Sequence, residues 1–313
     1  MKKTIAHLFY TPTWVSIFLG SLLLLWQLWA GALSDSVQVT FFAFFIFATG
    51  IPHGALDHLV EKETASRERK PFNLLVFLAK YLATMLFYTV VWFFVPTASL
   101  FFFLLISAWH FGETDLENAP NTPLWNAARF LFGVLVLSSL LLTHASETAP
   151  FWSRITQNAP ISMSVWQFSV ENKILILSIL SLIFLVVFVQ ANRKSPVVFD
   201  KNRLFRLVLI LTLAYFLPLL PAFALYFGGW HALCAFKSIY EYLTAQNPQA
   251  SPLSIWLKSV PFTLLAFAFL AFALWYWQHF FQSFDPLPML FVFLSLITLP
   301  HLGVMHSMNS KKA

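Results

Sequence analysis

The sequence predicts an all-α polytopic membrane protein, a bundle of about ten transmembrane helices with both termini in the cytoplasm. Of its 313 residues, 59% are hydrophobic and only 10% are charged, and the mean hydropathy is +0.73. Soluble domains carry a charge on about 25% of their residues. The apolar residues also lie in runs close to the roughly 20 residues that a helix needs to cross a bilayer. We therefore expect a single integral-membrane domain over residues 1–313.

Ten apolar runs follow one another along the chain. They cover approximately residues 14–33, 37–57, 74–95, 97–112, 125–143, 174–191, 204–219, 221–243, 256–277 and 287–307. The first has an apolar core longer than the roughly 7 to 15 residues of a signal-peptide h-region, so we expect it to be a retained span. Only Pro96 separates the third run from the fourth, and Pro218 and Pro221 separate the seventh from the eighth. Each of these joints could be a tight hairpin or a kink in a longer segment.

Basic residues between the runs predict the orientation, because cytoplasmic loops are enriched in Lys and Arg. With ten spans and a cytoplasmic N-terminus, the basic residues placed inside are Lys2, Lys3, Lys62, Arg67, Arg69, Lys70, Arg193, Lys194, Lys201, Arg203, Arg206, Lys311 and Lys312. Only Arg154 and Lys173 stay outside. An even number of spans therefore fits the charge pattern, and we expect the protein in the inner (plasma) membrane of the cell.

Composition also excludes some partners. The net charge of +6 is explained by topology and anionic lipid rather than by nucleic acid, because the basic residues form no patch interleaved with aromatic residues. The single Cys234 excludes an internal disulfide. No feature of the sequence predicts the oligomeric state.

Four of the apolar runs carry histidines at a comparable depth: His53, His110, His231 and His301. Imidazole is costly inside a membrane unless it is paired, hydrated or bound to a metal. In the ten-span topology these residues lie about 15 to 24 Å below the outer surface, at 1.5 Å per residue, on spans that run in the same direction. Four imidazoles at one level can meet at one metal ion, since imidazole suits Zn, Cu, Fe and Ni.

Carboxylates near these histidines suit a supporting role. Asp57 follows His53 by four residues and Glu113 follows His110 by three, spacings that place two side chains on one helical face. Metal-bound histidines usually donate their second N–H to a carboxylate or carbonyl. The alternative is that both carboxylates only end their spans at the cytoplasmic interface. Two further histidines, each five residues after a motif histidine and expected to support the site or the interface rather than bind metal, are His58 and His306.

Small residues beside the third histidine indicate close packing. Gly228 and Gly229 precede His231, and small residues let helices approach closely in membrane bundles. We expect this pair to bring the His231 helix against a neighbour.

Four segments share one order and spacing with a known family: Pro52–Asp57, Trp109–Glu113, Tyr226–His231 and Leu299–His301. They resemble the Brp/Blh family of bacterial and archaeal membrane β-carotene 15,15'-dioxygenases. The resemblance implies an iron(II) enzyme that uses O2 to split the central double bond of β-carotene into two retinals. It also implies that His53, His110 and His231 are iron ligands, and that the partners are a lipid-soluble carotenoid, O2 and membrane lipid.

The chain departs from the family at one position. The family has a further ligand histidine four residues after the third, and this chain has Ala235 there. His301, at the same predicted depth, is the replacement that we expect first. A centre of three histidines with open positions, or a shift to a related reaction or substrate, would be an alternative. The other residues that could replace the missing ligand are His58, His306 and Glu113.

Two other functions stay open from the residues alone. A membrane-embedded zinc hydrolase would use Glu113 or Asp57 as the general base for a metal-bound water, but the sequence lacks a His-Glu-x-x-His arrangement. A non-enzymatic transporter or haem-binding protein would use paired histidines from two spans as axial ligands.

Overall fold

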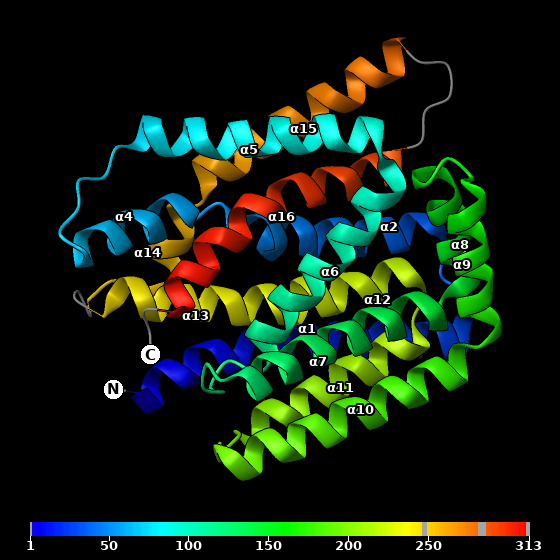
Figure 1. Cartoon of the computed structure of the whole chain (residues 1–313), viewed down its shortest axis with the longest axis horizontal. Helices are drawn as coiled ribbons and strands as arrows, with labels where there is room; N and C mark the ends of the chain where they lie inside the picture. Colours follow the sequence, from blue (N-terminus) through cyan, green and yellow to red (C-terminus); the bar gives the residue numbers. More distant parts are fainter. Residues whose placement is uncertain (1, 246–248, 281–285, 311–313) are drawn as a thin grey trace. The chain divides into compact units, whose positions relative to one another are not determined.

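A computed structural model describes residues 2–245, 249–280 and 286–310, apart from the side chains of residues 2–11, 277, 280, 286 and 287. Over these residues every regular element is a helix (Figure 1), which confirms the predicted all-α fold. Lys311 and Lys312 of the predicted cytoplasmic tail lie outside the described residues. Contacts divide the chain into two compact units. Unit 1 comprises Met1–Gly50, Ala108–Ala149 and Trp166–Lys237, and unit 2 comprises Ile51–Ser107, Pro150–Val165 and Ser238–Ala313.

The described part of the chain contains eight helices that are long and apolar enough to cross a membrane. They are Pro12–Ala30, Asp35–Arg67, Leu74–Phe94, Pro123–Thr143, Lys173–Lys194, Leu219–Thr244, Pro252–Tyr276 and Pro288–Ser310. The predicted runs 97–112 and 204–219 fall on α6 (Pro96–Asp115) and α11 (Lys201–Phe216), which are not among the eight. At Pro96 and at Pro218 one helix ends and another begins, so both joints are breaks between helices.

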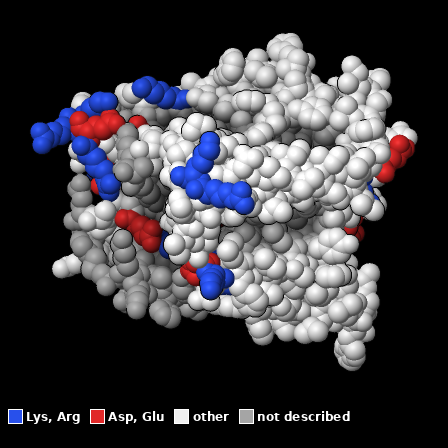
Figure 2. Space-filling view, turned by 60° about the horizontal axis from the view of Figure 1, so that its bottom comes forward, with Lys and Arg blue, Asp and Glu red and all other residues white. Residues whose placement is uncertain are grey.

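Large apolar side chains are exposed along several of these helices. Trp29 on α1, Phe93 on α5 and Ile174 on α10 are 92%, 80% and 78% exposed. On the face drawn in Figure 2, charged side chains are few and broad uncharged areas separate them. An apolar surface of this extent needs lipid to cover it. The helices are therefore those of a multi-pass membrane protein.

Unit 1 consists of helices from three parts of the chain. They are α1 (Lys2–Ala30), α2 (Asp35–Phe45), the π-helical turn η1 (Ile46–Gly50), the end of α6, α7 (Pro123–Thr143), the start of α8 (Ala145–Ile155), the end of α9 (Pro160–Glu171), α10 (Lys173–Lys194), α11, α12 (Leu219–Tyr226), the π-helical turn η2 (Phe227–Ala232) and the start of α13 (Leu233–Thr244). Side chains cap the N-termini of three of them: Ser34 accepts from the Val37 N–H in α2, Thr122 from the Trp125 N–H in α7 and Asp200 from the Asn202 N–H in α11. In this unit α7 packs along α10, and α2 along α12.

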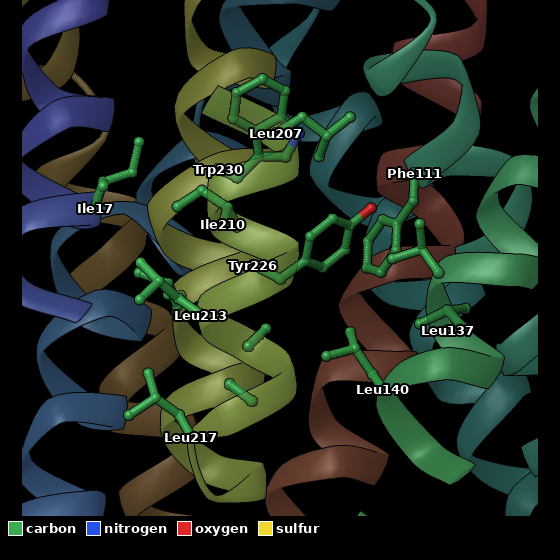
Figure 3. Close-up of a cluster of buried hydrophobic side chains, with 14 of the residues drawn as sticks. Ile17, Phe111, Leu137, Leu140, Leu207, Ile210, Leu213, Leu217, Tyr226 and Trp230 are labelled. Atoms are coloured by element: carbon green, nitrogen blue, oxygen red, sulfur yellow. The ribbon is translucent and has the colours of Figure 1, made fainter. Parts of the chain in front are cut away.

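The core of unit 1 lies where aromatic residues of α6, α12 and η2 meet aliphatic residues of α7 and α11 (Figure 3). The Phe111 and Tyr226 rings make an edge contact with their centroids 5.5 Å apart. Tyr226 and Trp230 are fully buried. Because lipid is as apolar as these side chains, close packing rather than exclusion from water must hold such helices together.

A crossing of α6 and α7 positions the segment that carries His110. A Cβ atom added at Gly112 would fall on the carbonyl oxygen of Arg129, and one at Gly133 would fall on that of Ala108. The two backbones are therefore in direct contact, which only glycine permits at these two points. His110 lies between Ala108 and Gly112 and is held at this crossing.

Unit 2 contains α3 (Ile51–Gly54), α4 (Asp57–Arg67), α5 (Leu74–Phe94), the start of α6, the ends of α8 and α13, the start of α9, α14 (Pro252–Leu257), α15 (Val260–Phe280) and α16 (Pro286–Ser310). Within it α16 packs on both α4 and α5. Arg67 ties α4 to α13 because its guanidinium donates to the Tyr242 carbonyl at 2.6 Å and lies over the Tyr242 ring at 3.9 Å. The Thr64 hydroxyl adds a 2.9 Å hydrogen bond with the Tyr242 hydroxyl.

Candidate metal centre

Unit 1 brings together two of the predicted histidines. His110 on α6 and His231 on η2 are both buried, and their ring centroids lie 4.7 Å apart with the ring planes at 75°. One ring nitrogen of each lies within 4.8 Å of one of the other. Two nitrogens that are each about 2.1 Å from one ion lie roughly 3 to 4 Å apart. The pair is therefore close to the spacing of two ligands on one metal.

Aromatic side chains surround this pair. The Phe111 ring lies 4.5 Å from the His231 ring, and the Phe227 ring stacks on it at 5.8 Å with the planes at 15°. These rings restrict the rotation of the His231 imidazole and keep water from one side of it. Apolar shells of this kind control solvent access to a metal site.

Both predicted segments around His53 and His231 contain a π-helical turn. His231 lies inside η2, and η1 ends at Gly50, three residues before His53. π-Helical turns are rare and occur frequently at functional sites. Their position next to two predicted ligands is evidence for the site that is independent of the histidines themselves.

The two π-helical turns pack against each other within unit 1. The Thr49 hydroxyl on η1 donates to the Gly228 carbonyl on η2 at 2.9 Å. A Cβ atom at Gly228 would lie 2.7 Å from Cβ of Phe45, and one at Gly229 would lie 2.9 Å from Cβ of Ser16. The close approach predicted from this glycine pair is thus confirmed.

Unit 2 brings together the other two histidines. His53 on α3 and His301 on α16 are both buried, and their ring centroids lie 5.0 Å apart in an edge contact. Nδ1 of His301 lies 2.8 Å from Oδ1 of Asp57, and the Tyr81 hydroxyl donates to Oδ2 of Asp57 at 3.1 Å. When His301 is neutral and donates Nδ1–H to this carboxylate, Nε2 is its metal-binding atom.

The position of Asp57 corrects one expectation from the sequence. A continuous helix would put Asp57 on the same face as His53, but α3 ends at Gly54 and α4 begins at Asp57. The four-residue spacing therefore does not describe one helical face here. The carboxylate that the sequence assigns to His53 lies against His301.

The other candidates differ in their surroundings. His58 is half-buried, with Nδ1 3.0 Å from the Ala55 carbonyl oxygen and its ring 4.4 Å from that of Phe262. His306 is exposed, and Glu113 is buried on α6. His306 is therefore less suited to a buried metal site than the buried histidines, and its exposure agrees with the expected interfacial position.

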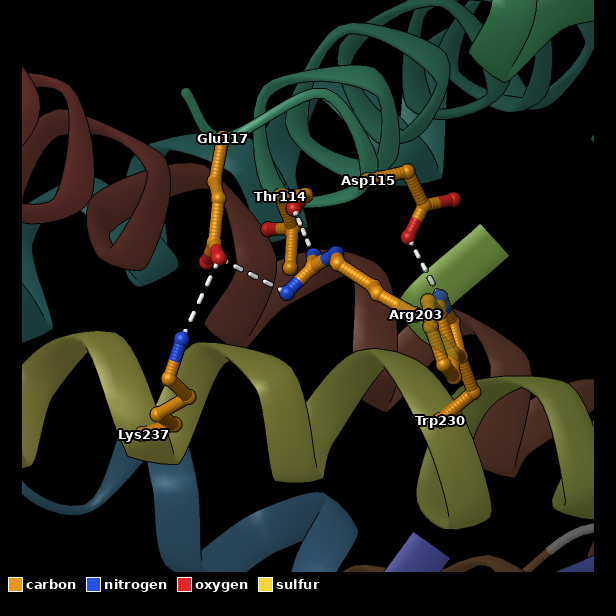
Figure 4. A network of polar contacts seen from close by, with 6 residues as sticks. All are labelled: Thr114, Asp115, Glu117, Arg203, Trp230 and Lys237. Atoms are coloured by element: carbon orange, nitrogen blue, oxygen red, sulfur yellow. Dashed lines mark hydrogen bonds and ion pairs between the residues drawn. The ribbon is translucent and has the colours of Figure 1, made fainter. Parts of the chain in front are cut away.

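Sequence reasoning missed one acidic residue near the histidine pair. Asp115, at the end of α6, accepts hydrogen bonds from Nε1–H of Trp230 at 2.6 Å and from the Tyr226 hydroxyl at 2.7 Å (Figure 4 shows the first). The signal was its position two residues after the Trp109–Glu113 segment and five residues after His110, a spacing that does not put two side chains on one helical face.

Residues 44–309 match the family model described as β-carotene 15,15'-dioxygenase. The chain belongs to this family. A relative from an uncultured marine bacterium, 66A03, named β-carotene 15,15'-dioxygenase, is 28% identical over 194 residues, which cover 62% of this chain and 66% of the relative. No solved structure matches the chain.

Membership of the β-carotene 15,15'-dioxygenase family confirms the resemblance noted in the sequence, and a dioxygenase family suggests a metal cofactor. The donor set is compatible with iron among other metals, because the buried pair His110 and His231 offers imidazole nitrogens within 4.8 Å of each other, and imidazole suits Zn, Cu, Fe and Ni. All four predicted histidines lie in the matched range 44–309.

Proposed function

We propose that this protein cleaves the central 15,15' double bond of β-carotene with O2 and releases two molecules of retinal. Family membership over residues 44–309 and the name of the bacterial relative support this reaction. The structural observation that carries the proposal is the buried pair of His110 and His231 on neighbouring helices of unit 1.

The metal in this proposal is iron(II), held by His53, His110 and His231. Each of the three is buried and can offer one ring nitrogen. His53 follows η1 by three residues, and η1 packs against the turn that contains His231. His301 is the proposed fourth ligand, because Asp57 engages its Nδ1 and leaves Nε2 as the ligand atom.

The side chains around the ligands perform the remaining tasks. Bound iron would supply the site at which O2 becomes reactive. The neutral imidazoles would leave the iron its +2 charge, and Asp57 fixes the tautomer and the ring orientation of His301. Phe111 and Phe227 hold the His231 ring and exclude water from one side of it.

The substrate enters from the membrane in this account. β-Carotene partitions into the bilayer, and the exposed apolar side chains of the helices place the protein in the same phase. We place the protein in the inner membrane with both termini in the cytoplasm, with carotenoid, O2 and lipid as its partners and no nucleic acid.

Expression in a host that accumulates β-carotene tests the proposal. We expect loss of the orange colour and appearance of retinal, with the His110→Ala variant as a membrane-inserted control that leaves the colour unchanged. Iron without porphyrin absorbance in the purified protein separates this reading from a haem protein. An inserted, iron-containing wild-type protein that leaves β-carotene intact would contradict the proposed reaction.

A further inference from the structure

We propose that Asp115 is a positioning residue that sets the geometry of the His110–His231 pair through Trp230 and Tyr226. This inference rests on the metal centre proposed above. It assigns to Asp115 the role of keeping the two histidine ligands in position.

Asp115 connects the two helical segments that carry the histidines. It lies five residues after His110 on α6, and its two bonding partners lie on the α12–η2 segment that contains His231. Trp230 directly precedes His231. Both carboxylate oxygens are used, Oδ1 by the Trp230 indole and Oδ2 by the Tyr226 hydroxyl. One side chain of α6 therefore holds the α12–η2 segment at two points, at Tyr226 on the end of α12 and at Trp230 within η2.

Burial strengthens the two hydrogen bonds of Asp115. Asp115 is 5% exposed and Tyr226 and Trp230 are fully buried, so water does not compete for the two hydrogen bonds. A buried indole N–H and a buried phenol O–H each need an acceptor, and a carboxylate accepts from both with stronger bonds than a neutral group. A π-helical turn forms i→i+5 backbone hydrogen bonds in place of the regular α-helical ones. The two side-chain bonds to Asp115 add contacts that hold this segment against α6.

Figure 4 shows further charged side chains beside the Asp115–Trp230 hydrogen bond. The Arg203 guanidinium donates to the Thr114 carbonyl at 2.6 Å, pairs with Glu117 at 2.8 Å and lies 5.3 Å from the Trp230 ring. Lys237 on α13 also pairs with Glu117, at 3.2 Å. Glu117 thus shares the network with Asp115, but its carboxylate bonds to Arg203 and Lys237 rather than to the indole next to His231.

The test compares Asp115→Asn with Glu117→Gln in full-length protein. Each change removes one carboxylate charge from the same network with little change in volume. We measure Fe(II) affinity without oxygen, and the visible absorption of the Co(II)-loaded protein, which reports ligand geometry. Asp115→Asn should weaken iron binding about tenfold, as loss of outer contacts of a metal site does, and should change the Co(II) spectrum. Glu117→Gln should leave both near wild type.

A double-mutant comparison separates positioning from general destabilisation. Trp230→Phe removes the indole donor, so its effect on iron affinity and that of Asp115→Asn should not add when the two are combined. Equal losses in Asp115→Asn and Glu117→Gln, or wild-type affinity and an unchanged Co(II) spectrum in Asp115→Asn, would overturn the inference. Wild-type protein that binds iron but leaves β-carotene intact would contradict the proposed reaction alone. Wild-type protein that binds no iron would contradict both the proposed reaction and the positioning role of Asp115.

Discussion

At the scale of single residues, the site depends on how each histidine is held. His110 is fixed at the glycine crossing of α6 and α7, and His231 contacts the rings of Phe111 and Phe227. His301 is oriented by Asp57, which also accepts from Tyr81. The sequence indicates which histidines are candidate ligands, and their burial agrees with that. The pairing of Asp57 with His301 could not be predicted, because it joins residues 244 positions apart and depends on the helix break before Asp57.

The proposed ligands are tested one at a time. His53→Ala, His110→Ala and His231→Ala should each abolish bound iron and activity, because each removes one nitrogen from a centre with few ligands. The variants should still insert in the membrane, which fractionation checks alongside metal analysis. Stoichiometric iron in any one of the three would remove that residue from the ligand set.

Asp57 and His301 form the second test at this scale. Asp57→Asn should lower iron affinity about 10- to 100-fold. The neutral amide is a weaker acceptor for the His301 Nδ1–H than the carboxylate, so His301 loses its fixed orientation. His301→Ala should lose at least as much. His306→Ala on the same helix is the matched control, since His306 is exposed. Iron titration that gives the same affinity for all three variants as for wild type would exclude His301 from the centre.

At the scale of elements, the sequence patterns did not predict the π-helical turns η1 and η2. Apolar length indicated helices over 37–57 and 221–243, and helices are present there. Each is interrupted by a wider π-helical turn, and η1 packs against η2 with the Thr49 hydroxyl donating to the Gly228 carbonyl. Local residue preference does not encode that contact. The turn at His231 also means that Ala235, fully buried on α13, is not one regular α-helical turn beyond it.

Gly228→Ala tests the packing of these turns. The added Cβ would lie 2.7 Å from that of Phe45, so η2 must move, and we expect a loss of about 1 to 3 kcal/mol in stability and weaker iron binding. Gly303→Ala on α16 is the control, because nothing lies within 4 Å of the new Cβ. It should be neutral or stabilise by about 0.5 to 1 kcal/mol. Thermal unfolding in detergent compares the two variants. Equal stability of Gly228→Ala and Gly303→Ala would show that the close contact between η1 and η2 is not needed for stability.

At the scale of the whole molecule, composition alone predicted an all-helical membrane protein, and helix length and exposed apolar side chains agree with it. The number of crossings is harder to derive, because α6 and α11 carry polar ends that shorten their apolar stretches. The orientation depends on the basic loops.

Reporter fusions test the orientation. Fusions after Lys70, after Arg193 and at the C-terminus should all report the cytoplasm, because the basic residues of these loops favour that side. A C-terminus that reports the outside would require an odd number of spans.

The central claim is that this chain splits β-carotene symmetrically at an iron centre. The most direct measurement is the product balance of purified, iron-loaded protein given β-carotene and O2 in lipid nanodiscs. We expect two retinal molecules for each β-carotene consumed, and no product from the His110→Ala variant. Two aldehydes of unequal length, or retinal formed equally well by iron-free protein, would contradict the central claim.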